Sequence, residues 1–344
     1  MQHTTIAVDL AKAVFEVAVS HRPGKVAERH RLSRDRFLPF FVPQDPATVL
    51  MEACGSAHHW ARQIEALGHR VVILPPHRTR PYVVGNKTDR ADAKGLLEAH
   101  RNEMIRPVPV KSVDQQALAA LHRLRSAWIA ARTARINTVR GLLREFGVTI
   151  PLGARRVVPR LQLILIDRDS GLPDALRPVL EEAANEIVDL ERRLRVVEAQ
   201  LRALARQMPE VRKLRTIPGV GVITATAMVG FVGDVGRFPS GRHLASYLGL
   251  TPREHSSGQR RRLGAISKRG DVYLRTLLTH GARAVLRSAK FKDRPDRLRA
   301  WALDVERRRG HNKAAIALAN KIARVVWAVW RRETEFVEQV APVV

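Results

Sequence analysis

Four acidic residues stand where elements of secondary structure are expected to end or begin, and together they could bind divalent metal ions. Asp9 and Glu52 each follow a short apolar run, at the end of an expected strand. Asp89 and Asp92 begin an expected helix, where a spacing of three residues places both carboxylates on one face. Carboxylates brought together repel each other, and a hard cation such as Mg²⁺ relieves the repulsion through oxygen ligands. Two such ions could hold the attacking and leaving oxygens of a phosphoryl transfer.

A plainer interpretation exists for each acid taken alone. Asp89 could be a helix N-cap, and Glu52 could be an acid that happens to follow a buried strand. The complete set favours the metal site, because an acid occurs at each of the expected positions.

The stretch at residues 251–275 contains adjacent serines, a glycine and many cations. A serine hydroxyl is a weak nucleophile unless it is activated, and nearby arginines could neutralise a phosphodiester during attack. The residues by themselves favour a loop that contacts DNA, and a nucleophilic serine is the alternative. The serines are Ser256 and Ser257, and the cations expected to contact nucleic acid are Arg253, Arg260, Arg261, Arg262, Lys268 and Arg269.

The run Ile-Pro-Gly-Val-Gly at residues 217–221 precedes another expected helix. Such a turn exposes backbone N–H groups that can hold a phosphate without reading sequence, as in a helix-hairpin-helix motif. Pro218, Gly219 and Gly221 would then contact nucleic acid. A tight corner between two helices is an equally good interpretation.

The composition points to a polyanionic partner. Sixty Lys and Arg against 33 Asp and Glu give the chain a net charge of +27. Nucleic acid is the first candidate partner and an anionic membrane surface the weaker one. A single cysteine and the lack of a signal-like or spanning apolar segment lead us to expect a soluble cytoplasmic protein.

The expected elements divide the chain into an α/β part and a helical remainder. The first hundred residues alternate between strands and helices, which predicts a mixed sheet with helices on its faces. Residues 113–146 and 173–207 show helical periodicity and predict two long helices joined by a basic stretch, which would hold protomers together. Further helices are expected to about residue 332. There, His280 is expected in the core, and Trp327 and Trp330 in helix packing.

The motifs together resemble the DEDD transposases of the insertion-sequence one-ten family, most closely its eleven-eleven branch. The resemblance rests on AVDLAK at 7–12, MEACG at 51–55, NKTDRADA at 86–93, IPGVG at 217–221, and GLTPREHSSG with GAISKRGDVYLRTLLTHGAR through 283. These motifs keep the family order over nearly the whole chain. Ala7 and Cys54 stand where many relatives have Gly and Thr, and both flank the acids without replacing them.

The resemblance implies a RuvC-like domain of the RNase H fold at 1–110, a helical coiled-coil region for oligomerisation at 111–207, and a mainly α-helical transposase domain at 208–335. It implies that Asp9, Glu52, Asp89 and Asp92 bind Mg²⁺, two ions per site, and that Ser257 is the nucleophile that forms a covalent phosphoserine with DNA. It further implies a structured guide (bridge) RNA, target and donor DNA, a dimer or tetramer, and a nucleoid-associated prokaryotic protein.

We therefore expect an RNA-guided, Mg²⁺-dependent DNA recombinase that moves an insertion sequence. Two alternatives stay open at this point. One is a Holliday-junction nuclease in which the acids activate water and Ser257 is structural. The other is an inactive nucleic-acid-binding protein. Ser256 could also replace Ser257 in the attack.

Overall fold

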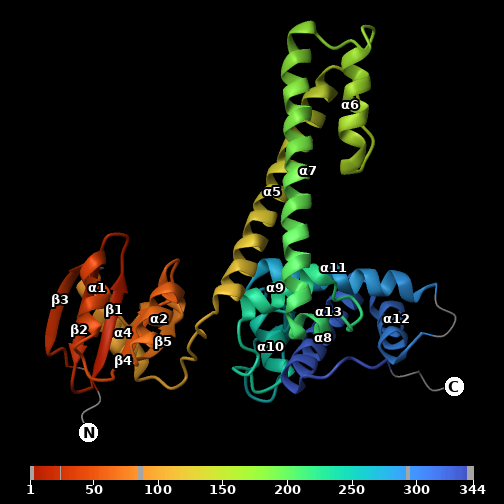
Figure 1. The fold of residues 1–344 in the computed structure, drawn as a ribbon. Coiled ribbons are helices and arrows are strands. Elements are labelled where there is room, and N and C mark those ends of the chain that lie inside the picture. The colour runs from red at the N-terminus through yellow and green to blue at the C-terminus, as the bar shows by residue number, and fades with distance from the viewer. Residues whose placement is uncertain (1–3, 24, 84–87, 292–294, 339–344) are drawn as a thin grey trace. The chain divides into compact units, whose positions relative to one another are not determined.

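The computed structural model describes residues 4–23, 25–83, 88–291 and 295–338, which fold as two compact units, Met1–Ser112 and Val113–Val344 (Figure 1). Each unit has its own apolar core and is described by itself. Asn86 and Lys87 of the motif at 86–93 lie outside the described residues.

The first unit is built on a five-stranded mixed sheet with the strand order β3-β2-β1-β4-β5. The first three strands are antiparallel neighbours, whereas β1, β4 and β5 run parallel. The strands are β1 (Thr5–Leu10), β2 (Val14–Ser20), β3 (Glu28–Ser33), β4 (Thr48–Glu52) and β5 (Arg70–Leu74). The mixed sheet expected from the alternating apolar runs is confirmed.

Helices cover both faces of this sheet. They are α1 (Arg34–Phe41), α2 (Ala57–Ala66), α3 (Pro76–Thr79), the 3₁₀ turn η1 (Arg80–Tyr82) and α4 (Asp89–His100). Successive strand residues point to opposite faces. Val8 and Met51 therefore pack with side chains of α1 and α2, whereas Ala7 and Leu50 pack with side chains of α4.

The second unit begins with a helical hairpin formed by α5 (Val113–Glu145) and α7 (Arg177–Gln207), which lie side by side (Figure 1). Both long helices match the periodicity of the sequence. The linking stretch is more ordered than expected, because it forms η2 (Ala154–Arg156), α6 (Val157–Ile166) and η3 (Asp174–Leu176). The apolar side chains of α6 explain this, since Val157, Leu161 and Ile164 are buried against the two long helices.

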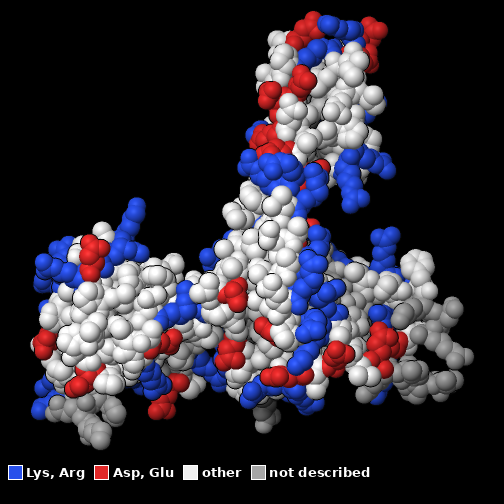
Figure 2. All heavy atoms as spheres, in the orientation of Figure 1, with Lys and Arg blue, Asp and Glu red and all other residues white. Residues whose placement is uncertain are grey.

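Ion pairs cross the helical hairpin. Arg125 binds Glu198 at 2.9 Å, and Arg135 binds Glu186. Figure 2 shows cations and acids interspersed on these helices. Part of the positive charge of α5 is therefore balanced by carboxylates on the neighbouring helix.

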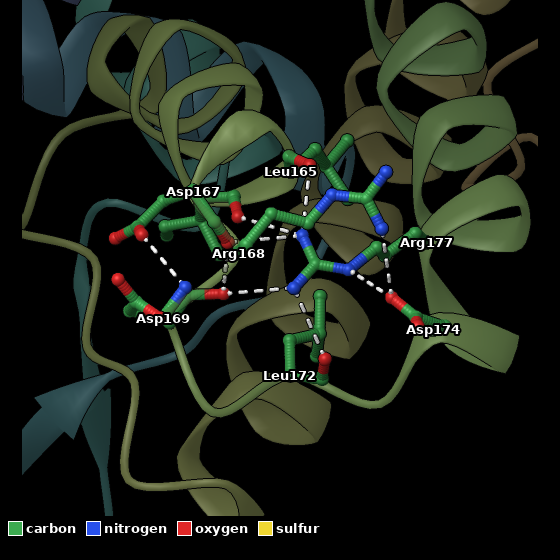
Figure 3. A network of polar contacts seen from close by, with 9 residues as sticks. Leu165, Asp167, Arg168, Asp169, Leu172, Asp174 and Arg177 are labelled. Atoms are coloured by element: carbon green, nitrogen blue, oxygen red, sulfur yellow. Dashed lines mark hydrogen bonds and ion pairs between the residues drawn. The ribbon is translucent and has the colours of Figure 1, made fainter.

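One arginine closes the end of the helical hairpin (Figure 3). The guanidinium of Arg177, at the start of α7, donates to the carbonyl oxygens of Leu165 at 2.8 Å, Asp167 at 3.1 Å and Leu172 at 3.2 Å. It also donates to the Asp174 carboxylate at 3.0 Å. The last carbonyls of a helix lack partners within the helix, so Arg177 satisfies groups that α6 would leave open.

The body of the second unit is a helical bundle. Its elements are α8 (Pro209–Leu214), α9 (Val222–Val232), α10 (Gly241–Tyr247), α11 (Val272–Ala289), α12 (Arg297–Arg309) and α13 (His311–Arg332). Helix α13 lies at its centre, because Ala315, Leu318, Ile322 and Val326 are fully buried at steps of three and four residues. The lower ends of α5 and α7 pack on α9 of the same unit (Figure 1).

Two glycines allow the turn at 217–221 to touch α11. A Cβ atom on Gly281 would lie 2.1 Å from the carbonyl oxygen of Gly219, and one on Gly219 would lie 2.8 Å from the oxygen of Gly281. Gly219 also has a φ of +82°, which favours glycine. The run Ile-Pro-Gly-Val-Gly is thus the corner between α8 and α9, and this corner is clamped against α11.

The Gly- and Arg-rich stretch forms a β-hairpin where the sequence predicts only a loop. Its strands β6 (Pro252–Glu254) and β7 (Leu263–Ile266) pair antiparallel. Gly258 has a φ of +55°, and backbone hydrogen bonds join Ser257 to Arg260 in both directions, as in a two-residue hairpin turn with glycine first. The pattern of the sequence hides these strands because nearly all of their side chains are exposed, so no apolar alternation marks them.

The packing predicted for three residues of the C-terminal helices is confirmed for two tryptophans and wrong for one histidine. Trp327 and Trp330 pack on the core as expected, and the Trp327 indole donates to the carbonyl oxygen of Phe238 at 2.9 Å. His280 is exposed, so its expected place in the core is wrong. It follows the buried Leu278 by two residues, which is about 200° around the helix. No helix among the described residues has the length and apolar character that crossing a membrane requires.

Candidate active site

The sheet of the first unit brings two of the four predicted acids to one edge and one face. In the parallel pair β1–β4, Val8 is opposite Met51, so the next residues of the two strands are Asp9 and Glu52. Both acids continue the alternation of Ala7 and Leu50, which pack with α4. Asp9 and Glu52 therefore belong to the face of the sheet that α4 covers, at the carboxyl ends of neighbouring strands.

Helix α4 carries the other two acids in its first turn. Its N-cap is Thr88, whose hydroxyl accepts a hydrogen bond from the backbone N–H of Ala91 at 3.2 Å. The N-cap role considered for Asp89 is thus held by its neighbour. Asp92 directly precedes Ala93, which is buried in the same apolar cluster as Ala7. The side chain of Asp89 lies outside the described part of the structure.

Two contacts near these acids could not be read from the sequence. The Thr79 hydroxyl, buried at the end of α3, donates to a carboxylate oxygen of Glu52 at 2.8 Å. On the next strand, Glu16 is opposite Asp9 and lies 3.6 Å from the guanidinium of Arg31. Thr79 fixes one oxygen of Glu52, and Arg31 offsets the charge that Glu16 adds beside Asp9.

Among the described side chains, no group of three His, Cys, Asp or Glu lies close enough to hold a metal ion. The donor set around this edge nonetheless has the chemistry that Mg²⁺ prefers, because Asp9, Glu52 and Asp92 offer carboxylate oxygens and no nitrogen or sulfur. They come from two adjacent strand ends and from the first turn of the helix that covers them.

The β6–β7 hairpin of the second unit carries the two candidate serines. The Ser256 hydroxyl donates to a carboxylate oxygen of Glu254 at 2.7 Å and accepts from the backbone N–H of Arg262 at 3.1 Å. Ser257 is exposed at the first position of the tip turn, and within the described chain no group hydrogen-bonds to its hydroxyl. Ser256 therefore links the two strands, whereas the hydroxyl of Ser257 is available to an incoming group.

The base of this hairpin is held by close backbone contacts. A Cβ atom on Gly270 would lie 1.9 Å from the carbonyl oxygen of Tyr247, and one on Gly249 would lie 2.0 Å from that of Arg269. The Arg275 guanidinium donates to the carbonyl oxygens of Leu248 and Arg269, each at 3.1 Å. The two chain segments that enter and leave the hairpin are thus fixed against each other.

The predicted nucleic-acid contacts lie in two places. Gly221 is exposed and Pro218 is half-buried, at the start of α9. The predicted cations of the hairpin region are all exposed: Arg253, Arg260, Arg261, Arg262, Lys268 and Arg269. Arg261 lies 3.4 Å from the Glu254 carboxylate, and Arg253 donates to the carbonyl of Ser267 at 3.3 Å. Arg260 and Arg262 lie on the returning side of the hairpin, where Arg260 is opposite Ser257 and the backbone N–H of Arg262 donates to Ser256.

A buried histidine lies where α5, α9 and α11 meet. The Thr226 hydroxyl donates to the carbonyl of Val222 at 2.7 Å, so His122 Nε2–H donates to Thr226 at 3.0 Å. The other ring nitrogen, Nδ1, then accepts from the Tyr273 hydroxyl at 3.0 Å. Burial, together with the nearby Arg125, lowers the pKa of His122 to about 4. His122 is thus a neutral structural residue beside the start of α11.

Comparisons with known proteins agree with this arrangement. Residues 6–148 match the family model described as a transposase of the DEDD IS110 type, and residues 211–297 match the model of the transposase IS116/IS110/IS902 family. The chain is 43% identical over 335 residues to a probable family 20 transposase of Pseudomonas aeruginosa, covering 97% of this chain and 98% of the relative.

Two further relatives are named for insertion sequences. The transposase for insertion sequence element IS1111A of Coxiella burnetii is 39% identical over 96% of this chain and 90% of its own length. The transposase for insertion sequence element IS1328 of Yersinia enterocolitica is 34% identical over 97% of this chain and 98% of its own length. The α/β sheet with its acidic edge and the helical unit with its basic hairpin are those of an enzyme that acts on DNA. The chain belongs to the IS116/IS110/IS902 family of transposases.

Proposed function

We propose that this transposase cuts and rejoins DNA through a covalent phosphoserine on Ser257. The observation that carries the proposal is the β6–β7 hairpin, which presents the Ser257 hydroxyl at an exposed tip between cations. Arginines beside the tip favour the approach of a phosphodiester and stabilise the negative charge that develops on the phosphoryl oxygens during attack. Gly258 adds no side chain at the turn, so a DNA backbone can come close.

The proposed step balances without a co-reactant. The Ser257 oxygen bonds to phosphorus while one phosphorus–oxygen ester bond of the strand breaks, and the proton lost by serine is matched by the proton gained by the released deoxyribose hydroxyl. The phosphoserine conserves the energy of the broken ester. Attack by a hydroxyl of another strand then restores the serine and completes the exchange.

We propose the sheet of the first unit as the RuvC-like domain, with Asp9, Glu52, Asp89 and Asp92 as ligands for Mg²⁺, two ions per site. The all-oxygen donor set and its position at neighbouring strand ends support this assignment. Bound there, the ions would stabilise the charge on the phosphoryl oxygens as Lewis acids. Because these acids belong to the first unit and Ser257 to the second, we propose a composite site assembled by docking within or between protomers.

A structured guide RNA and an oligomeric assembly complete the proposal. The net charge of +27 supports binding to more nucleic acid than one short duplex site. We propose a homo-oligomer, dimer or tetramer, held by the helical hairpin of α5 and α7, with target and donor DNA as substrates.

A covalent trap tests the proposed chemistry. Element-end DNA with a nick beside the exchange site is incubated in Mg²⁺ with protein purified together with RNA from the element's flank. We expect a covalent adduct on denaturing gels that maps to the Ser257 peptide, and a loss of at least about 10³-fold with Ser257→Ala. Ser256→Ala should keep most of the adduct and serves as the neighbouring control. Efficient cleavage by Ser257→Ala without any adduct would instead indicate a water-activating nuclease.

A further inference from the structure

A basic groove runs along α13 to the base of the β6–β7 hairpin. Its larger hollow, of about 850 Å³, lies between β7 on one side and α12 and α13 on the other. A second hollow of about 510 Å³ shares Lys321 and Arg324 with the first and continues toward the start of α10. The cations of this α13 groove, with the amide and the indole beside them, are Arg242, Trp301, Lys313, Asn320, Lys321 and Arg324.

The cations of the α13 groove are not neutralised. Among the residues that the structure describes, no Asp or Glu lines either hollow, and Lys313, Lys321 and Arg324 form no ion pair with a carboxylate. On the helical hairpin, by contrast, arginines such as Arg125 and Arg135 bind glutamates of the neighbouring helix. The positive charge of the α13 groove therefore stays available to a ligand. The paired arginines of the helical hairpin instead help to hold α5 and α7 together.

One of these cations is held in place by an aromatic ring. The Lys321 ammonium lies 4.1 Å from the ring centroid of Trp301. Burial, and then the charges of Arg324 and Arg297, lower the pKa of Lys321. Bringing a phosphate into the groove would relieve this repulsion. The Lys321 ammonium is thus held in position, and no carboxylate of the described residues forms an ion pair with it.

The size and position of the groove favour a single nucleic-acid strand as its ligand. A hollow of this volume accommodates a few nucleotides of one strand, and the apolar wall formed by Trp301, Ile266 and Ile316 suits the faces of bases. From Pro252 at the hairpin base to Ser257 the chain spans at most about 17 Å at about 3.4 Å per residue. That length equals about five nucleotides of one strand in B-DNA. A strand bound in the groove is therefore within reach of Ser257.

We propose that the α13 groove binds an unpaired segment of the DNA strand that Ser257 attacks, with its phosphates on Lys313, Lys321 and Arg324 and its bases against the apolar wall. This inference rests on the proposed function. The groove would hold the DNA strand at a point a few nucleotides away from the phosphodiester that reacts with Ser257.

The test measures the affinity of the full-length protein for a labelled 15-nucleotide single-stranded DNA by fluorescence anisotropy over a range of salt concentrations. The groove variant is Lys313→Gln with Lys321→Gln. The matched control is Arg195→Gln with Arg206→Gln, which removes the same charge from exposed, unpaired positions of α7. We expect the groove variant to weaken single-strand binding about tenfold and to reduce the salt slope by about 1.4, whereas the control changes affinity less than twofold.

Binding of two other nucleic acids, a duplex DNA and a single-stranded RNA, distinguishes between the ligands that the groove could bind. A matched duplex DNA should lose much less affinity than the single strand in the groove variant, and so should a single-stranded RNA of the same sequence. Equal losses in the groove and control variants would overturn the proposal, and a loss confined to RNA would assign the groove to the guide instead. Unchanged thermal unfolding of both variants excludes misfolding as the cause. Binding is measured without strand cleavage, so failure here is distinguishable from failure to form the serine adduct.

Discussion

Ser256 and Ser257 are neighbours in the chain, yet their hydroxyl groups have different surroundings. The Ser256 hydroxyl is engaged by the Glu254 carboxylate and by the backbone N–H of Arg262, and it links the two strands of the hairpin. A carboxylate that accepts a hydroxyl proton is also the arrangement of a general base. Comparing the covalent adduct formed by Ser256→Ala with that formed by Ser257→Ala therefore shows which serine is the nucleophile and which one only links the two strands.

Thr79 offers a test of the acidic edge at the scale of one hydroxyl. Thr79→Val keeps the shape of the side chain but removes the hydrogen bond to Glu52, so one carboxylate oxygen loses its orientation. We expect the Mg²⁺ concentration for half-maximal strand cleavage to rise about tenfold, as is usual when a group that orients a metal ligand is removed. The measurement is a Mg²⁺ titration of cleavage.

Thr79→Ser is the control, because it keeps the hydroxyl and should restore the Mg²⁺ dependence. If both variants lost activity equally while the Mg²⁺ requirement stayed constant, Thr79 would have only a packing role. Thermal unfolding of both proteins monitors that role directly.

His122 makes the stability of the second unit depend on pH. Its pKa is about 4 in the folded protein and about 6.5 when unfolded, so the folded state disfavours the protonated form. The stabilising effect is complete above about pH 6.5 and is lost as the pH falls toward 4. Between pH 7 and pH 5 we expect a loss of about 2 kcal/mol in the free energy of unfolding.

Urea unfolding followed by tryptophan fluorescence measures this effect, since four of the five tryptophans lie in the second unit: Trp128, Trp301, Trp327 and Trp330. His122→Gln should be less stable at pH 7, because the network around Thr226 and Tyr273 is disturbed. Its stability should nevertheless fall less than that of the wild type between pH 7 and pH 5. A parallel decrease in both proteins would assign the pH dependence to other groups.

Functional residues could be predicted where the signal is local in the sequence, and could not where their partners are distant in the chain. Asp9 and Glu52 could be singled out because strand ends are local features, and the register of the sheet then brings them together. Thr79 and His122 could not be identified, because their partners lie 27 and more than 100 residues away in the chain. Glu254 was close in sequence to Ser256, but its role depends on a hairpin that the sequence does not mark.

At the scale of elements, the contact between Gly219 and Gly281 decides how the corner of α8 and α9 sits on α11. Gly281→Ala would place a methyl group 2.1 Å from a backbone oxygen, and neither backbone can move without displacing its helix. We expect a loss of about 3 kcal/mol in the free energy of unfolding. Chemical denaturation checks the value.

Gly141→Ala is the matched control, since Gly141 is also helical and a Cβ there would meet nothing within 4 Å. It should leave stability unchanged or raise it by up to about 1 kcal/mol. Similar losses in both variants would contradict the close contact. The contact gives Gly219 a packing role, and binding of phosphate at Gly221 and Pro218 stays a prediction.

Most elements that bury apolar side chains were predictable from the sequence, with α6 as an exception, whereas the exposed β6–β7 hairpin was not. Strands β1, β4 and β5 are buried on both faces and appear as short continuous apolar runs, whereas the long helices α5 and α7 bury one face and leave a helical periodicity in the sequence. The β6–β7 hairpin buries almost nothing and is stabilised by backbone pairing and by Ser256. Helix α6 was missed because Pro159 and the flanking arginines resemble a linker, although its apolar residues are buried on the long helices.

At the scale of the whole molecule, the positive charge is divided between two uses. Several arginines of the helical hairpin are paired with acids of the neighbouring helix, whereas the cations Arg260 and Arg262 of the β6–β7 hairpin and Lys313 and Arg324 of the α13 groove are exposed. Only unpaired cations release counterions from nucleic acid in full. The net charge of +27 therefore reports the binding surface better than a count of arginines would.

The proposed assembly can be tested on the outside of the helical hairpin. Leu121 packs on the core of its own unit, so a charge there would disturb folding. Leu124, Val188 and Val196 are 46–52% exposed, although apolar. We expect Leu124→Asp combined with Val188→Asp to yield smaller species by light scattering, because a charge cannot be buried cheaply at an apolar interface. Val42→Asp, on an exposed apolar position of the first unit, is the control. An unchanged mass would place the contacts between protomers elsewhere.

The exposed β6–β7 hairpin that carries Ser257 should make the protein sensitive to proteolysis when no nucleic acid is bound. Three consecutive arginines, Arg260 to Arg262, follow its tip, and neither strand is covered by a core. Proteases that cut after basic residues select such accessible segments. Free protein should thus be nicked first at the part it needs for chemistry, and nucleic acid bound there would act as its shield. Unloaded transposase would be short-lived, which would limit the element to moving only when its substrates are at hand.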